Sequence, residues 1–297
     1  MNHDVTVVKC GGSPLIDRAG LCRDVAALAS AGHRVVLVHG GAAEVDRLAQ
    51  RLGVPQRRLT TPSGSSSRYT DPATLEVLQL ALAGKVKPEL VAALNRNGAR
   101  AVGLTGMDGG VLRARRAAAH HAVLDGRKKM IRDDHNGRIR EVDPTLLRLL
   151  LGDGCTPVLS PPALAEDGTP VNVDADRTAT AVAVALGAAR LVLLTGAPGV
   201  LADHRDESSV LPTFPVAPSG PVGDAAVGGM TAKLQAARGA LLGGVTDVVV
   251  ADGRVNAPLS AAFAGGGTRV RLAAPDTDGA FAGAPETETT TVGVRPC

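Results

Sequence analysis

Short runs of β-branched residues alternate along this chain with longer stretches rich in alanine and leucine. Apolar runs cover residues 5–9, 34–38, 156–160, 190–195 and 246–251, and stretches with helical spacing cover 17–31, 42–52, 72–96, 175–187 and 230–243. This alternation is typical of a mostly parallel sheet with helices on both faces. The apolar runs are continuous, as burial of both sheet faces requires. The pattern predicts an α/β three-layer sandwich with an open central sheet.

Residues 107–142 interrupt this rhythm. Asp-Gly and Asn-Gly pairs separate short segments there, which predicts β-hairpins projecting from the sheet. Within this segment, residues 113–140 hold nine Lys or Arg and three acidic residues, about +6, while the whole chain carries +3. The rest of the chain therefore carries about −3. The basic segment is either an interaction surface or an ordinary solvated hairpin.

The remaining composition excludes several classes of protein. A net charge of +3 is too small to indicate a nucleic-acid binder, and Cys10, Cys22, Cys155 and Cys297 show neither disulfide nor zinc spacing. No apolar run reaches the roughly 18 residues that a membrane span needs, and the first apolar run starts too early to leave room for a signal peptide. We therefore expect a cytoplasmic protein without a membrane association or a resident metal.

Three glycine-rich turns follow predicted strands, at residues 9–13, 39–42 and 195–199. The carboxyl ends of parallel strands gather ligands, and glycine lets backbone N–H groups approach an anion. Glycine also serves tight turns for purely steric reasons, so their joint placement carries more weight than any one turn. Lys9 ends the first predicted strand. An ammonium group at this place could bind an anionic ligand, or it could simply be solvated.

A second lysine, Lys233, lies in the sequence GGMTAK at the start of a predicted helix. No P-loop pattern of the form G-x-x-x-x-G-K-[ST] occurs in the chain. Neither His39 nor any cysteine is placed to act as a general base or nucleophile, and His39 suits a packed position at its turn. A nucleotide site would therefore be of another type than a P-loop.

Eight motifs occur in order between about residues 5 and 270: VVKCGGS, VLVHGGAAEVDRLAQRLG, SRYTDPATLEVLQLALAGKV, AVGLTGMDG, VNVDADRTATAVA, LVLLTGAPGVL, GGMTAKL and VVVADGR. As a set they are specific, and with them the chain resembles the amino-acid kinase superfamily. Within it the sequence is similar to the acetylglutamate kinase family. The resemblance is greatest to its relatives that act on aminoadipate or glutamate attached to an amino-group carrier protein of the LysW type.

The resemblance implies roles for individual residues. Lys9 and Lys233 would stabilise the transferring phosphoryl group, and Asp176 would orient both lysines. Asp176 could otherwise be an ordinary carboxylate at a helix N-terminus. The expected substrate-binding residues are Gly40, Gly41, Arg68 and Asn172, and the expected phosphate- and nucleotide-binding residues are Gly11, Gly12, Thr195, Gly196 and Gly199. ATP would bring Mg²⁺, held mainly by the nucleotide.

A carboxylate acceptor explains the missing base. With an ordinary pKa of about 4 it is ionised at neutral pH and needs charge compensation instead of deprotonation. Fixed cations and oriented N–H groups supply this compensation in phosphoryl transfer. The sequence therefore indicates a kinase that forms an acyl phosphate; the alternative from another class is an inactive binding protein of the same fold.

Three features favour a carrier-bound acceptor over free N-acetylglutamate. The segment HGGAAEVDRLAQ is similar to the carrier-dependent kinases, and Met107 stands where acetylglutamate kinases usually have lysine. The basic segment lies where carrier-dependent enzymes face an acidic carrier, so Arg115, Arg116, Arg127, Lys128 and Lys129 are candidate docking residues. N-acetylglutamate kinase remains the alternative. Whether aminoadipate or glutamate is the acceptor stays open, as does the pathway.

The expected organisation has two lobes and a tail. Residues 1–170 would form a substrate-binding lobe that includes the hairpins, residues 171–271 a nucleotide-binding lobe, and residues 272–297 a loosely ordered tail rich in Thr, Pro and Gly. The chain starts close to its first strand, without the extension that arginine-sensitive hexamers of the family use. We therefore expect a homodimer.

Overall fold

The computed structural model describes residues 4–60, 66–223 and 228–273. Its central sheet has eight strands, in the spatial order β14 (Thr213–Val216), β16 (Thr268–Leu272), β15 (Asp247–Asp252), β13 (Arg190–Thr195), β1 (Val5–Cys10), β2 (Arg34–His39), β10 (Cys155–Ser160) and β5 (Arg100–Thr105). Neighbouring strands run parallel, except that β15 and β16 are antiparallel. The predicted open, mostly parallel sheet is confirmed.

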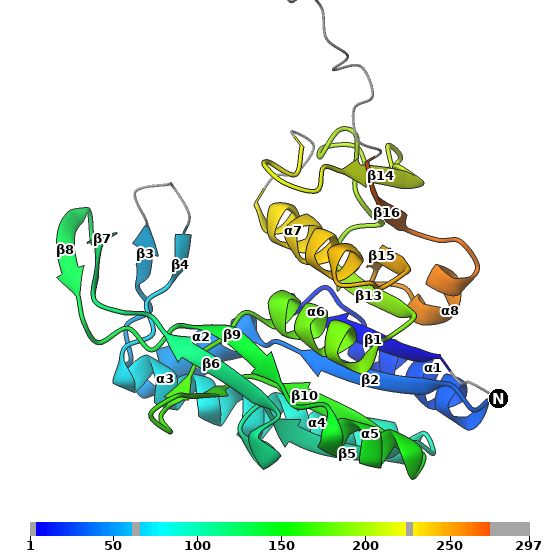
Figure 1. Ribbon diagram of the computed structural model, residues 1–297, viewed down its shortest axis with the longest axis horizontal. Coiled ribbons are helices and arrows are strands. Elements are labelled where there is room, and N and C mark those ends of the chain that lie inside the picture. The colour runs from blue at the N-terminus through cyan, green and yellow to red at the C-terminus, as the bar shows by residue number, and fades with distance from the viewer. Residues whose placement is uncertain (1–3, 61–65, 224–227, 274–297) are drawn as a thin grey trace, which may run out of the picture.

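Helices cover both faces of this sheet (Figure 1). Successive strand residues point to opposite faces, so Val8 of β1 packs with α1 (Arg18–Ser30), α4 (Lys87–Arg96) and α8 (Pro258–Phe263). Val7 packs on the other side with α5 (Thr145–Gly152), α6 (Ala175–Leu186) and α7 (Gly229–Leu242). The continuous apolar runs of the inner strands thus contribute side chains to two separate hydrophobic cores.

The long helical stretch predicted near residues 72–96 is not uniform. It consists of α3 (Pro72–Ala81), a π-helical turn at Leu82–Val86 and α4. Leu82 and Val86 of this wide turn press against Gly41, which precedes α2 (Ala42–Leu52); a Cβ on Gly41 would lie 2.6 Å from Leu82 Cδ2. The π-helical turn and the second glycine turn therefore fix each other's position.

Two smaller sheets lie beside the central one. The first contains β12 (Pro170–Val171), β11 (Ala163–Ala165), β6 (Leu112–Arg116) and β9 (Gly137–Val142). The second contains β4 (Ser66–Arg68), β3 (Arg58–Thr60), β7 (His120–Leu124) and β8 (Arg127–Ile131), and it stands apart on one side of the molecule in Figure 1. Asp125 and Gly126 both have positive φ, as a two-residue hairpin turn requires. The predicted hairpins are present.

Several elements have no counterpart in the sequence prediction, among them β5, β14, β16, α5 and α8. The tail was expected to begin at residue 272, but Leu272 pairs with Val216 as the last residue of β16. The expectation for the rest of the tail, residues 274–297, falls outside the described residues. Among the helices of the described part of the chain, none is long and apolar enough to cross a membrane.

Candidate active site

The three glycine turns meet at one edge of the central sheet, because β2, β1 and β13 are adjacent and parallel. A Cβ on Gly12 would lie 2.4 Å from the backbone nitrogen of Ala42, and one on Gly196 would lie 3.2 Å from Leu15 Cδ1. The backbone at Gly12 therefore leaves no room for a side chain. Such close backbone turns at a sheet edge fit an anionic phosphate group.

Lys9, Asp176 and Lys233 meet beside these turns. Lys9 is the next-to-last residue of β1, Asp176 lies in the first turn of α6, and Lys233 is in α7. Lys9 Nζ lies 2.9 Å from Asp176 Oδ1, and Lys233 Nζ donates a hydrogen bond of 3.3 Å to Asp176 Oδ2. The exposed fractions of the three side chains are 7%, 9% and 12% in that order along the chain. The group carries a net charge of +1 in a largely buried place.

The pKa values of the two lysines that share the Asp176 carboxylate are shifted in opposite directions. Burial by itself would lower the pKa of Lys9, but the Asp176 carboxylate outweighs this and raises it. For Lys233, burial and then the charge of Lys9 lower the pKa, and Asp176 offsets only part of that effect. Burial would raise the pKa of Asp176, yet the two ammonium groups hold it below its ordinary value. The site therefore favours an added anion near Lys233.

His39 ends β2 and is fully buried. Burial, as the main cause, lowers the pKa of His39 to about 4, and its Nδ1 lies 3.1 Å from the carbonyl oxygen of Gly40. At neutral pH the imidazole is uncharged. The interpretation of His39 as a packed residue is confirmed.

The expected substrate-binding residues surround the same edge. Gly40 and Gly41 lie between β2 and α2, and a Cβ on Gly40 would be 3.5 Å from that of Ala175 at the start of α6. Arg68 ends β4, and its Nη1 lies 2.7 Å from Asp46 Oδ1 of α2 and also contacts Gln56 Oε1. Its side chain is 17% exposed. Among the described residues, the contacts of this guanidinium use Nη1.

Asn172 follows β12 and is joined to Arg68 through Asn136. Asn172 Nδ2 donates to Asn136 Oδ1 at 2.9 Å, and Asn136 Nδ2 donates to the carbonyl oxygen of Arg68 at 2.7 Å. The two expected substrate ligands thus belong to one hydrogen-bond network. Asn136 belongs to an Asn-Gly pair, so the sequence by itself predicts only a turn there.

The turn expected to bind the nucleotide runs from Thr195, the last residue of β13, through Gly196 to Gly199. A Cβ on Gly199 would lie 2.6 Å from Thr268 Oγ1. The backbone N–H of Gly253 donates to the carbonyl oxygen of Thr195 at 2.8 Å, which ties this turn to the end of β15.

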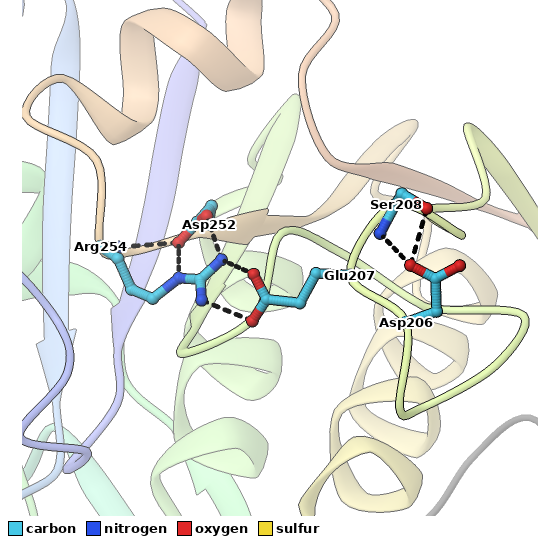
Figure 2. Close-up of polar contacts among 5 residues, drawn as sticks. All are labelled: Asp206, Glu207, Ser208, Asp252 and Arg254. Atoms are coloured by element: carbon cyan, nitrogen blue, oxygen red, sulfur yellow. Dashed lines mark hydrogen bonds and ion pairs between the residues drawn. The ribbon is translucent and has the colours of Figure 1, made fainter.

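Arg254 follows the end of β15 and binds a neighbouring loop through Glu207 (Figure 2). Its guanidinium forms two hydrogen bonds with Glu207, of 2.6 and 2.9 Å, and two with Asp252, of 2.9 and 2.8 Å. Among the described residues, the carboxylate of Asp206, drawn beside them, accepts only from Ser208. We name Glu207, Asp252 and Arg254 the arginine latch. Sequence reasoning missed it, because Glu207 and Arg254 are 47 residues apart.

The five candidate docking residues fall into two groups. Arg127, Lys128 and Lys129 are exposed on β8, whereas Arg115 and Arg116 are on β6 in the other small sheet. Arg115 is exposed, but Arg116 is half-buried and its Nε donates to the carbonyl oxygen of Asp134 at 3.0 Å. Arg116 therefore has a structural contact of its own.

In the described ranges no group of three or more His, Cys, Asp or Glu side chains is arranged to hold a metal ion.

Comparison with known proteins agrees with this architecture. Residues 4–252 match the amino acid kinase family. A [LysW]-aminoadipate kinase of Deinococcus radiodurans is 42% identical over 90% of this chain and 91% of its own length. An acetylglutamate kinase of Alkalilimnicola ehrlichii is 35% identical over 84% of this chain and 81% of its own.

A solved structure shows the same fold. N-acetylglutamate synthase from Neisseria gonorrhoeae has a TM-score of 0.72 and 27% identity, over 92% of this chain and 61% of that one. This chain thus spans less than two thirds of that protein. The family match and the identity to curated kinases together cover most of the chain, so the chain belongs to the amino acid kinase family and is a phosphotransferase.

Proposed function

We propose that this enzyme transfers the γ-phosphoryl group of ATP to the side-chain carboxylate of 2-aminoadipate or glutamate that is attached to a small acidic carrier protein. The observation that carries the chemistry is the buried group of Lys9, Asp176 and Lys233, with its net charge of +1 beside the glycine turns. The 42% identity to a [LysW]-aminoadipate kinase supports the carrier-bound acceptor.

The proposed reaction needs no proton transfer. An oxygen of the ionised acceptor carboxylate forms a bond to the γ-phosphorus, and the bond from that phosphorus to the bridging oxygen of ADP breaks with its electron pair. Lys9 and Lys233 offset the negative charge on the transferring group, and Asp176 keeps both ammonium groups in place. The products are ADP and an acyl phosphate.

The site residues divide between the two reactants in this proposal. Arg68 and Asn172, with Gly40 and Gly41, bind the acceptor, while Gly11, Gly12 and the turn from Thr195 to Gly199 bind ATP and its Mg²⁺. The division into a substrate lobe of residues 1–170 and a nucleotide lobe of residues 171–271 belongs to the same proposal, as do a homodimer and a cytoplasmic location. The central sheet itself runs through both lobes, since β1 pairs with β13.

N-acetylglutamate kinase is the second candidate function. It is supported by the 35% identity to an acetylglutamate kinase over 84% of this chain. Both candidates act on an N-acylated amino acid whose side chain ends in a carboxylate, so the group of lysines serves either equally well. They differ in whether the acyl group is acetyl or a protein.

Turnover of defined acceptors tests the proposal. Purified enzyme with ATP and Mg²⁺ is offered carrier-linked 2-aminoadipate, carrier-linked glutamate or N-acetyl-L-glutamate, and hydroxylamine traps the acyl phosphate as a hydroxamate. We expect turnover of a carrier-linked acceptor at a kcat/KM well above that of the free compound. Efficient use of N-acetyl-L-glutamate alone would favour the second candidate.

A lysine variant tests the mechanism in the same assay. Lys9→Met should lower kcat about 100-fold or more, because it removes a fixed cation from the transferring group. Lys85→Met is the matched control, since Lys85 is exposed and pairs with Glu89 on the helix surface. Equal rates for the two variants would refute the role given to Lys9.

A further inference from the structure

A network of amide, hydroxyl and carboxylate groups includes Asn172, and the proposed function uses only that member of it. Its members are Thr70, Asp134, Asn136 and Asn172. Thr70 and Asp134 are buried, and the two asparagines are half-buried. They come from three segments distant in the sequence, since only Asp134 and Asn136 are near each other in the chain, so the network is a product of the fold.

The direction of each hydrogen bond follows from Asn136. Its Nδ2 donates to the carbonyl oxygen of Arg68 at 2.7 Å and to Asp134 Oδ1 at 2.8 Å. A carbonyl oxygen and an ionised carboxylate only accept hydrogen bonds, so both must face the NH₂ group of Asn136. Backbone N–H groups of Thr70 and Asn136 also donate to Asp134 Oδ1, at 3.2 and 3.3 Å, which fixes that carboxylate.

The orientation of Asn136 in turn fixes Asn172. With its NH₂ group committed, Asn136 presents Oδ1, which accepts from Thr70 Oγ1 at 3.0 Å and from Asn172 Nδ2 at 2.9 Å. Rotating the Asn172 amide by half a turn would place two carbonyl oxygens against each other. Within the described residues, Asn172 Oδ1 has no hydrogen-bond partner, so this oxygen is the group available to a ligand.

We propose that Asn136 is a positioning residue that holds Asn172 Oδ1 toward the acceptor, where it accepts a hydrogen bond from the acceptor's amide N–H. This inference rests on the proposed function and names the amide N–H as the group through which the enzyme recognises its N-acylated acceptor. An ester in place of the amide has no hydrogen to donate, and its oxygen would face Asn172 Oδ1 without a proton between them.

An amide-to-ester exchange tests the inference. The probes are carrier-linked 2-aminoadipate and N-acetyl-L-glutamate, each compared with an analogue in which an oxygen replaces the amide N–H. We expect the enzyme to prefer the amide by about tenfold or more in kcat/KM. Equal use of amide and ester would overturn the inference and leave the proposed function intact. Failure to phosphorylate either amide would refute the proposed function and this inference with it.

The Asn136→Ala variant tests the positioning role. It should raise the KM for the amide acceptor about tenfold, leave the KM for ATP unchanged, and reduce the preference for amide over ester to about twofold or less. Tyr69→Phe is the matched control, because Tyr69 Oη donates to Asp133 Oδ1 between the same two segments without touching the network. A variant that loses activity equally on amide and ester would show a merely structural role. If Asn136→Ala does not fold, the amide-to-ester comparison on the unmodified enzyme decides the matter.

Discussion

Asp176 stands between two ammonium groups, and this arrangement gives the two lysines different properties. One carboxylate cannot fully compensate two buried cations, so the pKa of Lys9 is raised while that of Lys233 is lowered. An arriving phosphoryl group would supply the missing negative charge. Without a ligand, the two ammonium groups repel each other and the doubly protonated pair is destabilised. A bound phosphate would remove this repulsion.

The lowered pKa of Lys233 predicts a pH dependence. In the proposed mechanism the protonated ammonium is the active form, so kcat/KM for ATP, which reports the free enzyme, should fall as pH rises through a pKa that lies below the ordinary lysine value of 10.5. The acceptor carboxylate is ionised throughout this range and adds no titration. A profile of kcat/KM for ATP from neutral to alkaline pH, with a carrier-linked acceptor at saturation, measures the alkaline limb.

Lys233→Arg provides the test of that assignment. Guanidinium keeps its charge over the whole range, so this variant should lose kcat through altered geometry but also lose the alkaline limb. An alkaline limb at the same pH in both enzymes would assign the titration to another group. Thermal unfolding of both proteins at each pH separates loss of activity from loss of fold.

At the scale of elements, the inner strands could be predicted and the outer ones could not. β1, β2, β10, β13 and β15 are continuous apolar runs because both of their faces are buried. β5 lies at one edge of the sheet and has no buried residue among its first four, and β14 and β16 alternate at the other side. Their sequences carry too few consecutive apolar residues to indicate a buried strand.

The same division applies to the candidate site. Lys9, Asp176 and Lys233 were named through motifs, whose order along the chain is visible in the sequence. Asn136 and Arg254 act through partners 68 and 47 residues away, at Arg68 and Glu207, so only the fold brings them together. No local pattern distinguishes them from ordinary turn residues.

The arginine latch connects its loop to the end of β15, where Asp252 pairs in register with Thr195. Arg254→Ala should free this loop beside the proposed nucleotide turn, so the KM for ATP should rise by a few-fold while the KM for the acceptor stays unchanged. Glu207 is 60% exposed, which limits the strength of its pair. Steady-state kinetics with each substrate varied in turn measures the two KM values.

Asp206→Ala is the control for the latch, because Asp206 lies in the same loop but its carboxylate bonds, among the described residues, only with Ser208. It should leave both KM values as they are. A rise in the KM for ATP in both variants would mean that general loosening of the loop, and not the latch, affects the nucleotide. An unchanged KM in Arg254→Ala would remove the latch from nucleotide binding.

At the scale of the whole molecule, charge is distributed unevenly. The chain carries +3, yet residues 113–140 alone carry about +6. The structure divides this basic segment between two small sheets and leaves Arg127, Lys128 and Lys129 exposed on β8, which stands apart from the body of the molecule. A basic strand in that position suits an acidic protein partner better than a small free acceptor.

Ionic strength therefore separates the two kinds of acceptor. The KM for a carrier-linked acceptor should rise several-fold between about 50 mM and 500 mM salt, since exposed charges are screened beyond roughly one Debye length. Replacing Arg127, Lys128 and Lys129 together by serine should raise the same KM at low salt and flatten its salt dependence. The KM for N-acetyl-L-glutamate should respond to neither change, because a small acceptor does not reach β8.

The matched variant removes Arg138 and Arg140, which are also exposed and basic but belong to β9 in the other small sheet. If only long-range attraction to the net charge guided the carrier, removing these two charges would raise the KM for the carrier-linked acceptor about two thirds as much as removing the three charges on β8. If docking is local to β8, it should leave the KM for the carrier-linked acceptor within about twofold. An identical salt dependence in all three proteins would exclude the basic segment from carrier recognition.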